Sequence, residues 1–88
     1  MIDDVLILKA IADKTRFKIL KLLIKGEKCV CEIIPLLDVK QSTTSIHLRK
    51  LEVAEIIKSR RDGKKIYYKI NNQKVVKILK ALDYKKKE

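Results

Sequence analysis

The sequence predicts a mainly α-helical chain with one small β-hairpin. Apolar residues recur at helical spacing over most of its 88 residues, which indicates several amphipathic helices. One stretch departs from that period, because two runs of alternating polar and apolar residues flank Asp62-Gly63, a dipeptide favoured in tight hairpin turns. A chain of this length forms one domain with a small core. We therefore expect a single domain over residues 1–88, with marginal stability or help from a partner subunit.

The composition is strongly basic. Lys and Arg number 22 against 11 Asp and Glu, which gives a formal net charge of +11. This balance suggests a polyanionic partner, and nucleic acid before a membrane, because no segment approaches the roughly 18 consecutive apolar residues of a membrane span. The N-terminal residues 1–4 are acidic where an export signal is basic. We therefore expect a cytoplasmic protein.

The N-terminal part predicts two helices. The apolar positions of the first are Val5, Leu8, Ile11 and Ala12. The second covers residues 14–25, with Asp13 as its N-terminal cap and an apolar arc so wide that the helix should be largely buried. Gly26 follows, as expected at the end of a helix.

A third helix is predicted over residues 31–37. Pro35 has no backbone N–H and fits only the first turn, so the helix should begin near Cys31 after an extended Cys29-Val30. Residues 38–40 then form a turn before a fourth helix, over about residues 41–54. Two helices joined by a short turn form a helix-turn-helix.

The fourth helix has two different sides. Thr44, Leu48 and Leu51 share one side and should face the core. The other side carries Gln41, Ser42, Thr43, Ser45, Ile46 and Arg49. Amides, hydroxyls, a methyl surface and a guanidinium are the groups that contact base edges and phosphates, which predicts a recognition helix. A short amphipathic helix with a Ser/Thr-rich first turn is the alternative.

The hairpin is predicted over about residues 56–70, around a type I′ turn at Asp62-Gly63. The expected pairs are Arg61 with Lys64, Ser59 with Ile66, and Ile57 with Tyr68. One face then holds Ile57, Ile66, Tyr68 and Ile70, and the other holds Lys58, Arg60, Lys65, Tyr67 and Lys69. The tip carries Arg60, Arg61, Lys64 and Lys65. We expect it to lie against a phosphate backbone; the alternative is a solvated end whose charges prevent edge pairing.

Positive charge is concentrated around these elements. Between Lys40 and Lys69 there are nine Lys or Arg and three Asp or Glu, so 9 − 3 gives +6 of the total of +11. The last helix, over about residues 72–84, is apolar over a wide arc at Val75, Val76, Ile78, Leu79, Ala81 and Leu82. This arc predicts a dimer contact together with the first helix, unless the helix only closes its own core.

Four blocks together resemble the ArsR/SmtB family of winged-helix transcriptional repressors. They are residues 11–20 (IADKTRFKIL), 29–33 (CVCEI), 41–51 (QSTTSIHLRKL) and 61–68 (RDGKKIYY). The resemblance implies a winged helix-turn-helix homodimer that binds an inverted-repeat operator and releases it when a metal or metalloid binds. Two positions depart from the family pattern: Lys14 replaces Pro, and Glu55 replaces the Gly before the hairpin. A left-handed Glu costs about 1 kcal/mol or more, so we expect this helix end to be built differently.

The same resemblance makes Cys29 and Cys31 two thiolate ligands for As(III) or a soft metal ion. If Cys29 is extended before the helix, the two sulfurs share a side, which also suits oxidation. The family's third thiolate position is Ile34 here, and the last helix lacks the His residues of a zinc site. Two readings stay open: thiol-dependent sensing of a metalloid, soft metal or oxidant, or no inducer site at all.

The remaining residues argue against an enzyme. His47 is the only histidine, and we expect it to be structural or to contact phosphate. It forms no nucleophile, base or metal constellation with the two cysteines and the scattered carboxylates. The alternatives to an inducible DNA-binding repressor are a winged-helix DNA-binding protein without an inducer and a winged-helix module for protein or RNA interaction.

Overall fold

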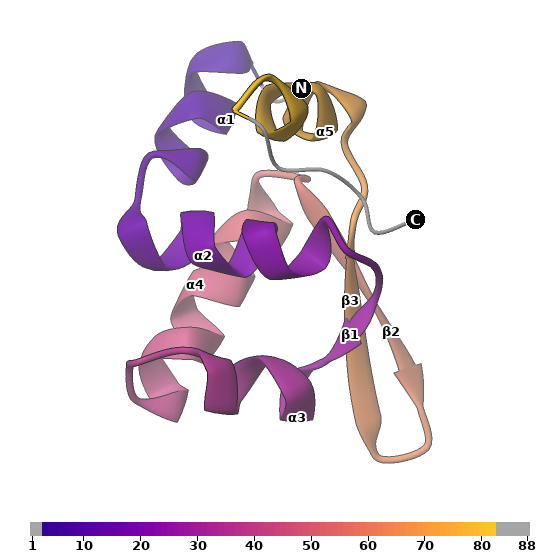
Figure 1. Cartoon of the computed structure of the whole chain (residues 1–88). Coiled ribbons are helices and arrows are strands. Elements are labelled where there is room, and N and C mark those ends of the chain that lie inside the picture. Colours follow the sequence, from indigo (N-terminus) through magenta and orange to yellow (C-terminus); the bar gives the residue numbers. More distant parts are fainter. Residues whose placement is uncertain (1–2, 83–88) are drawn as a thin grey trace.

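A computed structural model describes residues 3–82. It confirms a mostly helical fold with a small antiparallel sheet (Figure 1). The elements in chain order are α1 (Asp4–Ile11), α2 (Lys14–Leu23), β1 (Lys28–Cys29), α3 (Val30–Ile33), the 3-10 turn η1 (Ile34–Leu36), α4 (Gln41–Val53), β2 (Ile57–Asp62), β3 (Lys65–Ile70) and α5 (Gln73–Ala81). Within the described range no helix is both long and apolar enough to cross a bilayer.

Carboxylates begin the first two helices. The Asp3 side chain accepts a hydrogen bond from the backbone N–H of Leu6 (2.8 Å), and Asp13 accepts one from Arg16 (2.9 Å). The predicted cap at Asp13 is therefore confirmed. The helix that it starts, α2, is largely buried through Ile19, Leu20, Leu23 and the following Ile24.

Only part of the apolar pattern that predicted α1 faces the core. Ile7, Ala10 and Ile11 are buried, whereas Val5 and Leu8 are 58% and 53% exposed. This helix is apolar around most of its circumference, so periodicity alone could not select the side that meets α2. The exposed apolar side has no partner within the described chain.

The third predicted helix consists of two short pieces. A single α-turn, α3, passes into η1, whose first turn contains Pro35. Because Pro35 has no N–H, it interrupts the α-helical hydrogen bonding of so short a segment. The extended stretch also lies one residue earlier than expected: Lys28 and Cys29 form β1, and Val30 is already helical.

The sheet has three strands in the order β1-β3-β2, where a two-stranded hairpin was predicted. The missed contact is β1 with β3, which pairs Lys28 with Tyr68 and Cys29 with Tyr67. A strand of two residues is too short to leave an alternating pattern. We call the hairpin of β2, its turn and β3 the wing.

The predicted register of the wing was wrong by one residue on each strand. The observed pairs include Asp62 with Lys65, Arg61 with Ile66, Ser59 with Tyr68 and Ile57 with Ile70. The turn residues are Gly63 and Lys64, and Gly63 has φ +64°, which suits a type II′ turn with glycine first. Because the total shift is even, each side chain keeps its predicted face of the sheet.

The end of α4 also corrects a prediction. Glu55 does adopt the left-handed conformation, with φ +58°, and is the one non-glycine residue to do so among residues 3–82. The N–H of Ile56 donates to the carbonyl of Leu51 (3.0 Å), and that of Glu55 donates to Glu52 (2.9 Å). These two bonds form a Schellman motif, so the helix ends in the ordinary way with an unfavourable residue in the glycine position.

The core lies between the helices and the inner end of the sheet. Its fully buried members are Ile19, Leu20, Ile33, Leu51, Ile56, Val75 and Leu79, with the polar Thr44 among them. In Figure 1, α1 and α5 lie at one end of the molecule, and α3 and the tip of the wing lie at the other. An ion pair between Asp4 and Lys74 (2.7 Å) joins α1 to α5. Residues 83 and 84 of the predicted last helix lie outside the described residues.

Candidate nucleic-acid interface

The two predicted sides of α4 are confirmed. Thr44, Leu48 and Leu51 are buried, and the Thr44 hydroxyl donates to the carbonyl of Lys40 (3.3 Å), which satisfies the polar group in the core. Gln41, Ser42, Ser45, Ile46 and Arg49 are exposed, and Thr43 is half-buried. Ile46 keeps 56% of its surface exposed, which is unusual for an isoleucine. The contact of these residues with DNA stays a prediction.

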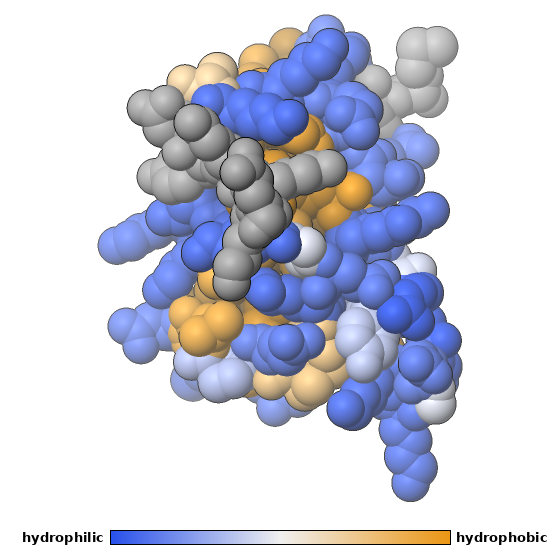
Figure 2. All heavy atoms as spheres, turned by 45° about the vertical axis from the view of Figure 1, so that its right-hand side comes forward, coloured by the Kyte–Doolittle hydropathy of each residue, from blue (hydrophilic) through white to orange (hydrophobic). Residues whose placement is uncertain are grey.

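Three of the four predicted wing cations are free to meet an anion. Arg61, Lys64 and Lys65 are exposed, and within residues 3–82 their side chains make no hydrogen bond or ion pair. Figure 2 turns the wing side forward and shows a face that is largely hydrophilic. The first turn of α4 adds backbone N–H groups without a side-chain cap, which also suits phosphate.

Arg60, the fourth predicted cation, is already engaged. Its Nε and Nη2 atoms donate to the two carboxylate oxygens of Glu27 at 2.9 and 2.8 Å. Its guanidinium lies 4.5 Å from the centre of the Tyr67 ring. The hydrogen bond from Arg60 lowers the pKa of Glu27, and the same bond raises the pKa of Arg60. Two donor atoms of Arg60 are thus committed to Glu27, and its Nη1 atom lies 4.0 Å from Asp62, although the side chain stays 53% exposed.

The wing is also attached to α4. The Ser59 hydroxyl donates to Glu52 of α4 (3.0 Å). Tyr68, on the same face of the sheet as Ser59, has its pKa raised by burial and further by the charge of Glu52. The two elements that could touch DNA are therefore in direct contact.

A polar cluster of Asp13, Arg16 and His47, which the sequence did not predict, holds α4 to the N-terminal helices. Arg16 donates from Nε to the carbonyl of Ala10 (2.7 Å) and from Nη1 to Nδ1 of His47 (3.0 Å). Asp13 lies 3.8 Å from the same His47 nitrogen. The structural role expected for His47 is supported by these contacts. His47 lies 31 positions after Arg16 in the chain, so no local pattern reveals the cluster.

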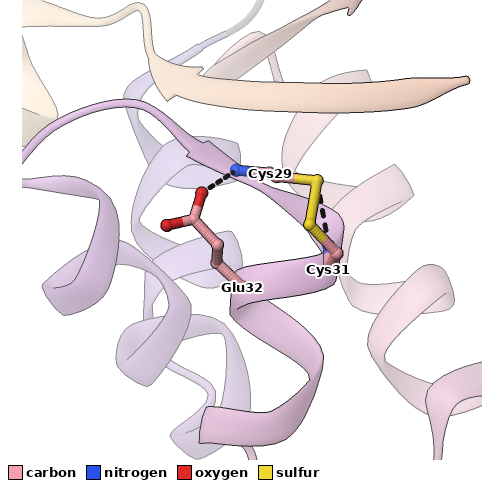
Figure 3. The surroundings of a disulfide bond; sticks show 3 residues. All are labelled: Cys29, Cys31 and Glu32. Atoms are coloured by element: carbon pink, nitrogen blue, oxygen red, sulfur yellow. Dashed lines mark hydrogen bonds between the residues drawn. A yellow bond between two sulfur atoms is a disulfide. The ribbon is translucent and has the colours of Figure 1, made fainter. Parts of the chain in front are cut away.

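The cysteine pair lies where β1 meets α3 (Figure 3). Cys29 Sγ and Cys31 Sγ form a disulfide, with 5.1 Å between the Cα atoms. Cys29 is buried and Cys31 is exposed. The Cys29 sulfur also accepts from the N–H of Cys31 (3.2 Å), while Glu32 accepts from the N–H of Cys29 (2.9 Å). A Glu three residues after the cap position is a known helix-start signal that could have identified Glu32.

These residues do not complete a metal site. In the part of the chain that the structure describes, no three His, Cys, Asp or Glu side chains converge on one point. Ile34, at the family's third thiolate position, is half-buried and offers no donor atom. Two sulfurs alone do not fit the three-thiolate arrangement that the resemblance implies for As(III).

The chain is similar to known bacterial regulators in sequence and in structure. Residues 13–59 match the profile described as bacterial regulatory protein, arsR family. An uncharacterised HTH-type transcriptional regulator of Methanocaldococcus jannaschii is 45% identical over 78 residues, which cover 88% of this chain and 88% of that protein. The arsenical resistance operon repressor of Staphylococcus aureus is 35% identical over 88% of this chain and 74% of its own length.

A solved structure agrees with the sequence matches. It is the solution NMR structure of the homodimeric winged helix-turn-helix DNA-binding domain of a possible ArsR-family transcriptional regulator from Mycobacterium bovis. The TM-score is 0.80 at 29% identity, over 90% of this chain and 73% of that one.

Proposed function

Because this chain belongs to the arsR family of bacterial regulatory proteins, we propose that it is a homodimeric repressor of transcription. Each subunit inserts α4 into the major groove of an inverted-repeat operator, and its wing lies against the neighbouring phosphates. That the chain is a DNA-binding regulator and not an enzyme follows from the family. The operator geometry, the dimer and the repression are the proposal.

The observation that carries this proposal is the exposed side of α4 next to unpaired cations. Ser42, Ser45 and Arg49 are exposed on α4, whose other side packs against the core. Arg61 and Lys64 are exposed on the wing, which is hydrogen-bonded to α4. Base edges are read by such polar side chains, and phosphates are held by such cations. α4 and the attached wing thus offer both kinds of contact.

The dimer is supported by apolar side chains at the opposite end. Val5, Leu6 and Leu8 on α1 and Leu82 after α5 are each between 47% and 58% exposed. Their proximity along two adjacent helices is typical of a surface that a second subunit covers. The Mycobacterium bovis relative is a homodimer. A two-fold axis through α1 and α5 presents two copies of α4 to one duplex.

The experiment is a fluorescence anisotropy titration. The labelled duplex covers the DNA immediately upstream of the coding sequence, with unlabelled random duplex and structured RNA as competitors. Arg49→Ala should weaken binding to the upstream duplex by roughly 1–3 kcal/mol, because it removes a base or phosphate contact. Lys25→Ala, which removes a charge at the end of α2, is the matched control and should change little.

Two outcomes contradict the proposal. If Arg49→Ala binds as tightly as the unmodified protein, the reading surface lies elsewhere. If structured RNA competes as well as the upstream duplex, the protein is an RNA-interaction module, which is the main alternative.

A second candidate function is the release of operator DNA by thiol chemistry at Cys29 and Cys31. It is favoured by the pairing of the Cys29 and Cys31 sulfurs at the junction of β1 and α3, since Cys29 of β1 is paired with Tyr67 of the wing. In the oxidative form, two thiols lose two electrons and two protons to a small disulfide or peroxide and form the S–S bond. A metalloid or soft metal is the alternative trigger, which needs a ligand that residues 3–82 do not supply.

The test titrates diamide, arsenite and cadmium separately into the protein bound to its upstream duplex. Release by a reagent should disappear in both Cys29→Ser and Cys31→Ser, since each variant leaves one sulfur. Release that persists in both variants removes the cysteines from the mechanism. No release by any of the three reagents supports a repressor without an inducer at this position.

A further inference from the structure

The strongest unexplained feature is the pair formed by Arg60 and Glu27. We infer that Arg60 is a positioning residue that fixes the direction of the wing, and that Glu27, although acidic, strengthens DNA binding by holding it. This inference rests on the proposed contact between the wing and DNA. It reverses the simple expectation for both residues, namely that the arginine binds phosphate and the carboxylate repels it.

Arg60 and Glu27 form a bidentate ion pair. The guanidinium meets both carboxylate oxygens of Glu27, at 2.9 and 2.8 Å, and it also lies over the ring of Tyr67. Tyr67 is directly opposite Arg60 in the strand register. Glu27 immediately precedes β1, which pairs with β3. A two-pronged arginine contact restrains direction as well as distance, which a lysine contact does not.

The opposite face of the wing carries a second attachment one residue away. Ser59 donates to Glu52 of α4 at 3.0 Å. Successive residues of a strand point to opposite faces, so Ser59 and Arg60 hold the wing from its two sides. Glu27 ties it to the loop after α2, and Glu52 ties it to the recognition helix.

Beyond Arg60 and Tyr67 the wing has little other support among residues 3–82. β1 pairs with β3 only at Tyr67 and Tyr68, residues 60–65 are all exposed, and the core contacts of β2 end at Ile57. The tip past these positions is a two-stranded ribbon, which is only marginally stable in water on its own. The direction in which Lys64 and Lys65 point is therefore set where this ribbon is attached, at Ser59, at Arg60 and at the pairing of Tyr67 with β1.

The experiment measures affinity for the upstream duplex over a salt series. It compares the unmodified protein with Glu27→Gln, Arg60→Gln, the double variant and two controls. Lys64→Gln removes an equal positive charge from the tip, and Glu55→Gln removes an equal negative charge away from the pair. Urea unfolding of each variant confirms that it is folded.

Glu27→Gln removes the ion pair and should weaken binding by roughly two- to five-fold, which is the scale of an exposed ion pair. This weakening is expected even though the protein becomes more positive. Arg60→Gln should weaken binding similarly, with the double variant no weaker than either single one. Neither should change the slope of log K against log salt. Lys64→Gln should reduce that slope by about 0.9 for each phosphate that the side chain neutralises. Glu55→Gln should bind as tightly as the unmodified protein, or slightly more tightly.

Two results overturn the inference. The first is a smaller salt slope in Arg60→Gln, equal to that of Lys64→Gln, which makes Arg60 a phosphate contact. The second is unchanged or tighter binding by Glu27→Gln. If Lys64→Gln and Arg49→Ala also have no effect, the proposed DNA contact itself fails, which is a different outcome.

Discussion

Glu55 holds a backbone conformation that suits glycine better. Its φ of +58° lies in the left-handed region, where a Cβ atom is strained and glycine is not. Glu55→Gly should therefore raise the free energy of unfolding by about 1 kcal/mol. The measurement is the midpoint of urea unfolding at constant slope. Glu55→Ala is the control, because it removes the charge and keeps the strain, and it should change stability by only a few tenths of a kcal/mol. Equal gains from both variants would assign the effect to charge.

Side-chain contacts between residues far apart in the chain could not be predicted from the sequence. Arg16 and His47 meet through the packing of α2 against α4, and Glu27 meets Arg60 through the pairing of β1 with β3. Each contact joins positions more than thirty residues apart. No periodicity within a window of the chain reports on such contacts. Local signals at helix starts, such as the cap at Asp13, can in contrast be predicted from neighbouring residues.

Among the elements, α2 depends on its cap at Asp13 in a pH-dependent way. The hydrogen bond from the backbone N–H of Arg16 lowers the pKa of Asp13 below its ordinary value of 3.8. A lowered folded-state pKa stabilises the fold above the unfolded pKa, and this contribution is lost as the pH falls through the folded value. Asp13→Asn keeps a capping oxygen but does not titrate.

The free energy of unfolding of the unmodified protein minus that of Asp13→Asn should therefore shrink as the pH falls below 3.8. Urea unfolding of both proteins across this range provides the measurement. A difference that is independent of pH, or that grows in acid, is incompatible with a lowered pKa at Asp13.

Elements with one clear apolar stripe were predictable. The sides of α4 follow directly from Thr44, Leu48 and Leu51, because only this stripe suits a core. In contrast, α1 is apolar almost all round, so its pattern does not indicate which side is buried. The wing register was wrong because Asp62-Gly63 and Gly63-Lys64 both allow a tight turn, yet the faces survived because strand side chains alternate with period two.

At the scale of the whole molecule, the exposed apolar side of α1 should form the dimer contact. Leu8→Glu places a carboxylate on that surface, and burying it without a partner costs roughly 3 kcal/mol or more. The variant should be monomeric in sedimentation equilibrium at concentrations where the unmodified protein is dimeric. Leu36→Glu, at a similarly exposed leucine of η1 far from α1, is the control and should remain dimeric. A dimeric Leu8→Glu variant would move the interface away from α1.

The most direct measurement is a hydroxyl-radical footprint of the protein on the DNA upstream of its coding sequence. A symmetric dimer with α4 in two successive major grooves predicts two protected patches related by an inverted repeat, with centres about 10 base pairs or a multiple of that apart. Arg49→Ala should give both patches only at protein concentrations roughly 5- to 150-fold higher, which corresponds to a loss of about 1–3 kcal/mol. Uniform or absent protection by the unmodified protein, or the same two patches at the same concentration in Arg49→Ala, would contradict sequence-specific binding through α4.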